Sequence, residues 1–335
     1  VPDEPLKQPD TPPSGRVAWL GSTLLAPLAK VRAHPRIALA VAAAGFLIVA
    51  ALTTWTILRP SKAERAARTA DAALEFLDRG DFDQAKKLAE ALHADGEASE
   101  QRAVAGYILG VAGVREAGKA DAGTRKALFL VAARYLEDAL RGGLPDERTG
   151  QAEVLLGRSL YDAGQVKVAR VALDRALASH PQRSAEIRRL LADSYLHDRE
   201  PNLPEALREN GLLLALEDLP PAERAEAVLQ KAEILDAMGK PEECLAVLAD
   251  IPSDAGQARA AAVLRGRALL SEVRALKAKP MDPNRHRETQ EKLQAALAAV
   301  RDTSRLDPAQ GISVRQAGYV VGACLLESGD TRGAL

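Results

Sequence analysis

The stretch that determines the predicted fold class is residues 150–183, GQAEVLLGRSLYDAGQVKVARVALDRALASHPQR. It predicts two antiparallel helices joined at Gly164, because glycine readily adopts the left-handed turn that ends a helix. Gly157 and Ala169 are small where the two helices must cross closely. Pro181 would end the second helix. The space between the helices would be filled by Leu160, Leu173 and Leu177.

The same frame recurs along residues 61–335. Small residues equivalent to Gly157 follow one another at steps of 37, 47, 35, 40, 34 and 56 residues, and they are Ala73, Gly110, Gly157, Ala192, Ala232, Gly266 and Gly322. We expect six full units and a seventh cut off in its second helix. Extra residues at 118–124, at about 278–288 and in EPNLP at 200–204 are either longer loops or lengthened helices.

The repeat in 150–183 resembles the tetratricopeptide repeat, with Leu156-Gly157, Tyr161 and Pro181 at matching positions. The signature tryptophan of that family is missing throughout. The resemblance implies an all-α fold, a solenoid of helical hairpins with a concave face for a protein or peptide partner. An ordinary helical bundle with coincidental spacing is the alternative.

The register of the resembled family assigns particular side chains to the concave groove. Tyrosine and arginine are enriched in binding hot spots, so Tyr107, Arg158, Tyr161 and Arg189 are the strongest candidates, although each could instead be solvated or packed. The full set also includes Val154, Asp193, Glu233 and Arg267. The family's carboxylate clamp is not supported, because its positions carry Ala70, Leu74 and Val154.

Residues 37–58, IALAVAAAGFLIVAALTTWTIL, contain no charged side chain. A helix of that length reaches about 33 Å, enough for the ~30 Å hydrocarbon core of a bilayer. Trp55 lies one turn from its end, where interfacial aromatic residues are common. We therefore expect a transmembrane helix at 36–59; a buried helix in a globular core is the alternative.

The segment that precedes the predicted span, residues 1–35, begins with a proline-rich stretch that predicts an extended linker. Its apolar run at 17–29 could lie in the membrane interface or form a plain linker helix. Four basic residues flank the predicted span on each side, so charge does not fix its orientation. Since long domains translocate largely regardless of charge, we expect the repeats outside the cytoplasm of a bacterial cell, in the periplasm or beyond.

Composition narrows the function classes. Aromatic residues make up 3% of the chain and 65 of its 335 residues are alanine, which disfavours an all-β fold. A net charge of −1 gives no reason to expect nucleic acid. Cys244 and Cys324 lie far apart without a CxxC motif, and the histidines are scattered. We expect no catalytic residues, no cofactor, no metal and no small-molecule substrate.

Two functions remain at this stage. The first is a non-catalytic, membrane-anchored scaffold that binds a protein or peptide in its concave groove. The alternative is the membrane and sensor part of a larger signalling enzyme, such as a bacterial transmembrane Ser/Thr kinase, because the chain starts at Val1 rather than Met and has a proline-rich stretch before the predicted span. An array that faces the cytoplasm is a third possibility.

Overall fold

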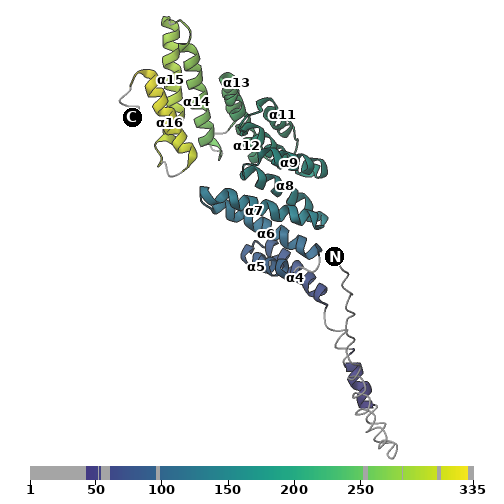
Figure 1. Cartoon of the computed structure of the whole chain (residues 1–335). Helices are drawn as coiled ribbons and strands as arrows, with labels where there is room; N and C mark the ends of the chain where they lie inside the picture. The colour runs from purple at the N-terminus through teal and green to yellow at the C-terminus, as the bar shows by residue number, and fades with distance from the viewer. Residues whose placement is uncertain are drawn as a thin grey trace, which may run out of the picture. The chain divides into compact units, whose positions relative to one another are not determined.

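The structure is a computed structural model that describes residues 43–51, 53, 61–95, 99–251, 256–280, 282–307 and 311–330. The chain divides into two compact units, Val1–Arg65 and Ala66–Leu335. All the secondary-structure elements assigned in these residues are helices (Figure 1). The all-helical class that the composition predicts is therefore confirmed for the described part of the chain.

In the first unit, the structure describes a helical segment at 43–51, residue 53 and residues 61–65, where the helix that continues into the second unit begins. Four large apolar side chains of the segment 43–51 are exposed, at 74% for Phe46, 67% for Leu47, 60% for Ile48 and 59% for Val49. Among the described residues, no helix has both the length and the apolar character needed to cross a membrane. The rest of the predicted span, and the linker predicted at 1–35, lie outside the described residues.

The second unit consists of consecutive helices. Their bounds are α4 Lys62–Asp78, α5 Phe82–Asp95, α6 Ser99–Lys119, α7 Ala122–Arg141, α8 Asp146–Asp162, α9 Val166–Ser179, η1 Pro181–Arg183, α10 Ser184–Leu196, α11 Leu203–Leu214, α12 Pro221–Ala237, α13 Pro241–Leu248, α14 Ala258–Lys277, α15 Pro283–Ser304 and α16 Ile312–Ser328. From α4 to α15 these helices form six successive pairs, and α16 follows them.

The quoted stretch folds as predicted. Helices α8 and α9 are joined at Gly164, whose φ of +84° lies in the left-handed region that glycine occupies without steric cost. Gly157 faces α9 so closely that a Cβ atom there would lie 2.5 Å from Cδ2 of Leu173. Leu173 itself is fully buried. A small residue at 157 is therefore what lets α8 and α9 pack.

Most of the predicted crossing positions behave in the same way. Ala73, Ala192 and Ala232 are fully buried. A Cβ atom at Gly110 would lie 2.6 Å from Leu136, and one at Gly266 would lie 2.8 Å from Val300. Gly322 is half-buried on α16. The recurrence of small residues in the sequence therefore marks close helix crossings.

The extra residues of the second and sixth units lengthen helices. Helices α6 and α7 have 21 and 20 residues, and α14 and α15 have 20 and 22. Asp121 ends the short α6–α7 connection by accepting hydrogen bonds from the backbone N–H of Gly123 and Thr124, a normal helix N-cap. The insertion at 200–204 is different, because residues 197–202 form a loop between α10 and α11.

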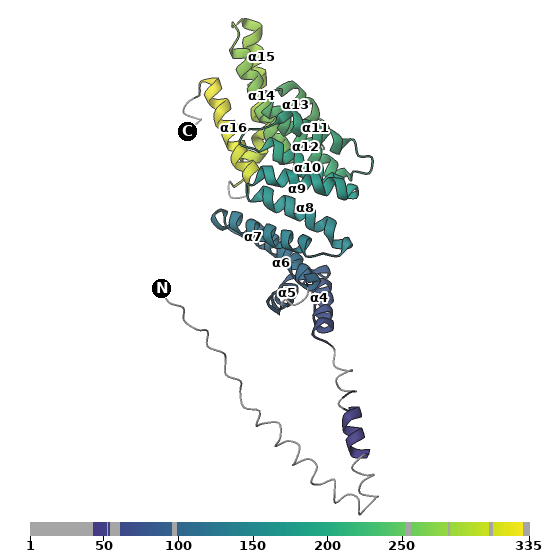
Figure 2. The same ribbon diagram turned by 45° about the vertical axis from the view of Figure 1, so that its right-hand side comes forward.

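Packing follows chain order. From α6 onward the first helix of each pair contacts its own second helix, and from α5 onward each second helix contacts the first helix of the next pair (Figures 1 and 2). Buried residues of α4 and α5 belong to one hydrophobic cluster. From α6 onward the first helices also contact one another in series, α6 with α8, α8 with α10, α10 with α12, α12 with α14 and α14 with α16. First helices are thus neighbours along the second unit, so side chains from several of them can share one surface.

Candidate functional site

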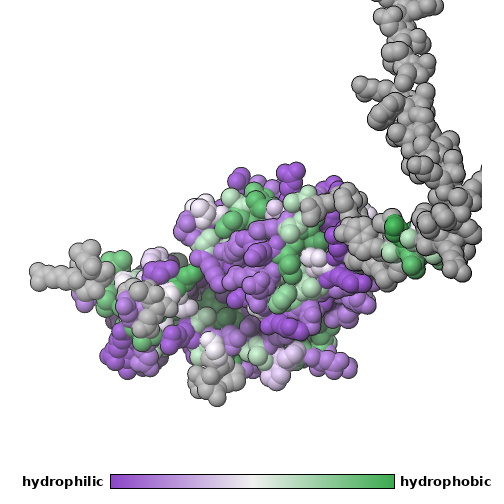
Figure 3. Space-filling view, turned by 90° about the horizontal axis from the view of Figure 1, so that it is seen from below, coloured by the Kyte–Doolittle hydropathy of each residue, from purple (hydrophilic) through white to green (hydrophobic). Residues whose placement is uncertain are grey.

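The candidate site lies on successive first helices. Six of the side chains that the repeat register assigns to the groove reach solvent, and we call them the first-helix row. They are Arg158 and Tyr161 on α8, Arg189 and Asp193 on α10, Glu233 on α12 and Arg267 on α14. Each is half-buried or exposed. The surface that Figure 3 shows is mostly hydrophilic over the second unit, with smaller hydrophobic patches.

Two residues predicted for the groove are buried instead. Tyr107 is 1% exposed and belongs to the core, and its hydroxyl donates a hydrogen bond of 2.8 Å to Oε1 of Gln151. Val154 is also 1% exposed and packs with Leu173 and Ile187. The prediction of Tyr107 as a groove anchor is therefore wrong, because residues 103–110 of α6 are buried on all sides.

Three arginines of the first-helix row are held by carboxylates. Nη1 of Arg189 lies 2.6 Å from Oε2 of Glu226, and Nη2 of Arg267 lies 2.6 Å from Oδ2 of Asp236. Arg158 lies 3.7 Å from Asp162, one helical turn away on α8. Each arginine side chain keeps 39–49% of its surface exposed. The three guanidinium groups are thus oriented but remain accessible to a partner.

The structure brings Tyr161, Asp193 and His197 together. The Tyr161 hydroxyl lies 3.4 Å from Nδ1 of His197, and the same nitrogen lies 3.1 Å from the carbonyl oxygen of Asp193. Burial raises the pKa of Tyr161, and the carboxylates of Asp193, Asp162 and Glu233 raise it further. The phenol therefore stays neutral and is positioned by α10.

A buried amide holds Asp193 in place. Gln230, which is 6% exposed, donates hydrogen bonds from Nε2 to Oδ1 of Asp193 at 2.7 Å and to the carbonyl oxygen of Arg189 at 3.0 Å. Its Oε1 accepts a hydrogen bond of 2.8 Å from Asn210. Burial raises the pKa of Asp193. The hydrogen bond from Gln230 lowers this pKa, as do the electrostatic interactions with His197 and Arg189. Gln230 therefore links α10, α11 and α12 behind the row.

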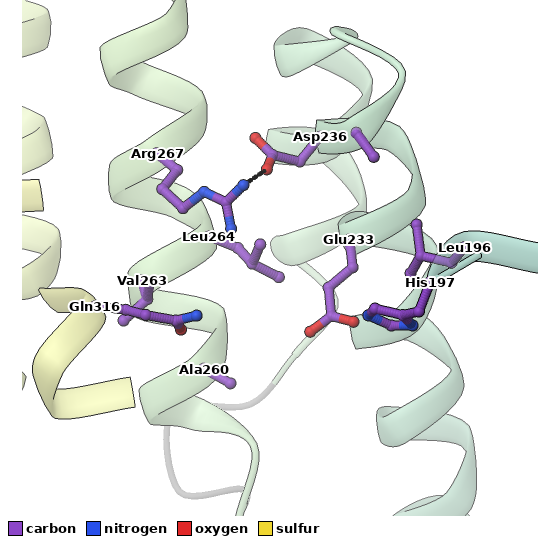
Figure 4. Close-up of a pocket in the computed structure, with 10 residues that line it drawn as sticks. Leu196, His197, Glu233, Asp236, Ala260, Val263, Leu264, Arg267 and Gln316 are labelled. Carbon is purple, nitrogen blue, oxygen red and sulfur yellow. Dashed lines mark ion pairs between the residues drawn. The ribbon is translucent and has the colours of Figure 1, made fainter. Parts of the chain in front are cut away.

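A pocket of about 300 Å³ is lined by residues at the end of α10 and on α12, α14 and α16. Figure 4 shows the Glu233 carboxylate pointing toward His197, and Arg267 reaching across to Asp236. Burial raises the pKa of Asp236, while Arg267 opposes the rise. The lining residues are Leu196, His197, Glu233, Asp236, Ala237, Ala260, Val263, Leu264, Arg267 and Gln316.

Several residues of this site were not predicted from the sequence. His197 lies four residues after Asp193, and Gln230 lies three residues before Glu233. Such spacings place two side chains on one helix face, so the signal was present. Which residues of that face meet across α10 and α12 depends on the approach of the two helices.

In the described part of the chain, no group of three or more His, Cys, Asp or Glu side chains is arranged to hold a metal ion. Cys244 and Cys324 are free and fully buried. Cys244 packs in the core cluster that contains Ala232, Leu248 and Leu264.

Comparisons with known proteins leave the family open. No family model matches the chain, and no curated protein matches it. Among solved structures, that of pilF from Pseudomonas aeruginosa is similar at 19% identity, covering 76% of this chain and 96% of its own, with a TM-score of 0.48. A likeness at that level carries no conclusion about the partner of this chain.

Proposed function

We propose that the chain is a non-catalytic helical-repeat scaffold that binds a protein or peptide partner on its first-helix row. One observation carries the proposal. Helices α8, α10, α12 and α14, which contact one another in series, present tyrosine, arginine and acidic side chains, and two of these, Glu233 and Arg267, also line a pocket. Preformed surfaces of this kind lose little conformational entropy on binding, and tyrosine and arginine dominate the energetics of protein interfaces.

Affinity capture with the full chain tests this proposal. We compare the wild-type chain with the double variant R158A/Y161A, which removes two side chains of the row. The matched control is V171A/R175A, which removes an exposed apolar side chain and an exposed arginine from α9, a second helix.

The wild type and the control should retain the same polypeptide, and R158A/Y161A should retain it about tenfold less or not at all. A partner that all three chains retain equally would remove the first-helix row from the proposal. A partner lost only in V171A/R175A would place binding on the second helices.

We also propose that residues 37–58 anchor the scaffold in a membrane. The uncharged run in the sequence supports this, and so does the exposure of Phe46, Leu47, Ile48 and Val49 in the described segment 43–51. Contiguous exposed apolar surface of that kind indicates contact with lipid or protein. The chain should stay with membranes through an alkaline carbonate wash, whereas a chain lacking residues 37–58 should be released. Release of both chains would contradict the anchor.

We propose that the repeats face the outside of the cytoplasm, as long domains after a single span commonly do. Protease added to intact spheroplasts should then digest residues 61–335. Protection until the membrane is broken would place the array on the cytoplasmic side instead.

A further inference from the structure

The pocket lined by the end of α10 and by α12, α14 and α16 combines apolar walls with charged ends. Its apolar lining comes from Leu196, Ala237, Ala260, Val263 and Leu264. Its polar lining comes from His197, Glu233, Asp236, Arg267 and Gln316. At about 300 Å³ it lies at the small end of the range for ligand pockets. A single long side chain with a polar head matches this volume and this division of the walls.

The charges around the pocket are unequal. Arg267 is engaged by Asp236, at 2.6 Å. Glu233 makes no ion pair and no hydrogen bond with any residue in the described part of the chain. The groups that interact with its carboxylate are Asp193 from α10, His197 directly after α10, Asp236 from α12 and Arg267 from α14. Among the groups that act on Glu233, two are carboxylates and Arg267 is the permanent cation, while Arg189 acts on Asp193.

This imbalance has an energetic consequence. A half-buried carboxylate loses hydration without gaining a partner, which is unfavourable until a cation or a proton neutralises it. Burial raises the pKa of Glu233, and Asp193 raises it further, while His197 and Arg267 oppose the rise. A cation that binds beside Glu233 would relieve both the lost hydration and the repulsion from Asp193.

We infer that this pocket takes a lysine side chain of the partner polypeptide, with the ammonium beside Glu233 and the methylene groups along Val263 and Leu264. The inference rests on the proposed function and names the chemistry that the row recognises. Lysine fits because its flexible four-carbon stem packs on apolar walls while its compact charge reaches a carboxylate. The guanidinium of Arg267 already occupies the Asp236 side of the pocket.

Peptide pools provide the probe. Acetylated and amidated heptapeptides carry lysine, arginine, norleucine or N-acetyl-lysine at the centre, and a mixture of Gly, Ala, Ser, Leu and Tyr elsewhere. Binding of the full chain to each immobilised pool is measured for the wild type, for E233Q and for E242Q. Glu242 is exposed on α13, so E242Q removes the same charge away from the pocket.

The lysine pool should bind the wild type about tenfold more tightly than the norleucine and acetyl-lysine pools, as the loss of a charged hydrogen bond predicts. E233Q should remove that preference, and E242Q should keep it. The acetyl-lysine pool tests the charge without any change to the protein.

Three outcomes would overturn the inference. Equal binding of the lysine and norleucine pools would leave the proposed function in place if R158A/Y161A still weakens both. Tighter binding of the arginine pool than of the lysine pool would show that the pocket takes arginine and not lysine. If no pool binds at all, the inference fails, and affinity capture with R158A/Y161A tests the proposed function separately.

Discussion

Gly157 on α8 packs directly against the side chain of Leu173 on α9: a Cβ atom at position 157 would lie 2.5 Å from Cδ2 and 2.6 Å from Cγ of Leu173. Leu173 is fully buried and packs with Ile187 and Leu191 of α10. The contact therefore couples one helix pair to the next. A change at position 157 must be felt by the core that α9 and α10 share.

We expect G157A to destabilise the fold by about 1–3 kcal/mol, the usual cost of overpacking a close contact. The matched control is G211A, since Gly211 is exposed on α11 and has no atom within 4 Å of an added Cβ. That variant should gain about 0.5–1 kcal/mol from better helix propensity. Urea unfolding followed by circular dichroism measures both. Equal effects of the two substitutions would show that α8 and α9 do not cross closely at Gly157.

The double variant G157A/L173A tests the same contact from its other side. L173A alone should cost about 2–5 kcal/mol because it leaves a cavity. In the double variant the added methyl group enters that cavity, so the combined loss should be smaller than the sum of the single losses by about 1 kcal/mol or more. Strict additivity in the four-chain cycle would mean that the two positions are not in contact.

Replacing Glu233 should strengthen the fold while it weakens binding. Its pKa is raised above the ordinary 4.5, so between the unfolded and the folded pKa the folded chain holds a proton that the unfolded chain has lost. The free energy of unfolding therefore falls as pH rises through that interval and stays lower above it. Glutamine does not ionise, so E233Q should be more stable than the wild type at about pH 7.

The stability difference between E233Q and the wild type should shrink below about pH 4, where glutamate is neutral in both states. Urea unfolding at both pH values measures it. A difference that does not vary with pH would contradict the ionisation argument, because only a change in packing would then remain.

Gln230 should be needed for the positions of Asp193 and Arg189. In Q230M the Asp193 carboxylate, the Arg189 carbonyl and the Asn210 amide lose their bonds to residue 230. We expect a loss of about 1–3 kcal/mol, the cost of buried polar groups left unpaired. Q294M is the control, since Gln294 is exposed on α15 and should be nearly neutral. Unfolding midpoints that agree for the two variants would rule out a structural role for Gln230.

The two cysteines should report on unfolding. Both are fully buried and free, and burial raises the pKa of each thiol to about 11. Because the thiolate is the reactive form, a disulfide reagent should label neither cysteine in the folded chain at about pH 8. Both should react promptly in guanidinium chloride. Rapid labelling of either one without denaturant would show that its helix pair opens readily.

The sequence predicted the features that depend on short-range geometry. The turn at Gly164 and the crossings at Ala73, Gly110 and Gly266 follow from sterics that few residues satisfy, and the structure has them at these positions. The same small and turn-forming residues also predicted six helix pairs. They can be recognised even though the number of residues between successive units varies.

The candidate site was less predictable, because exposure depends on neighbours. Tyr107 fits the groove register, yet α6 is enclosed so fully that residues 103–110 have no solvent face. His197 contacts Tyr161 only because α10 ends beside α8. Glu233 was assigned to the groove, but its lack of an ion pair could not be seen in the sequence. The repeat register predicts which helix face a residue lies on, but the residues that it contacts depend on how the neighbouring helices approach.

The order of packing in the second unit also has a mechanical meaning. In the described part of the unit, from α5 to α16, each helix contacts the next one, and from α6 onward each first helix also contacts the following first helix. These contacts are all local along the chain. Under tension such an array should extend in small steps, each releasing one hairpin while the others stay folded. Slack would let the hairpins re-form one by one, so a tether built this way would lengthen under load and shorten again.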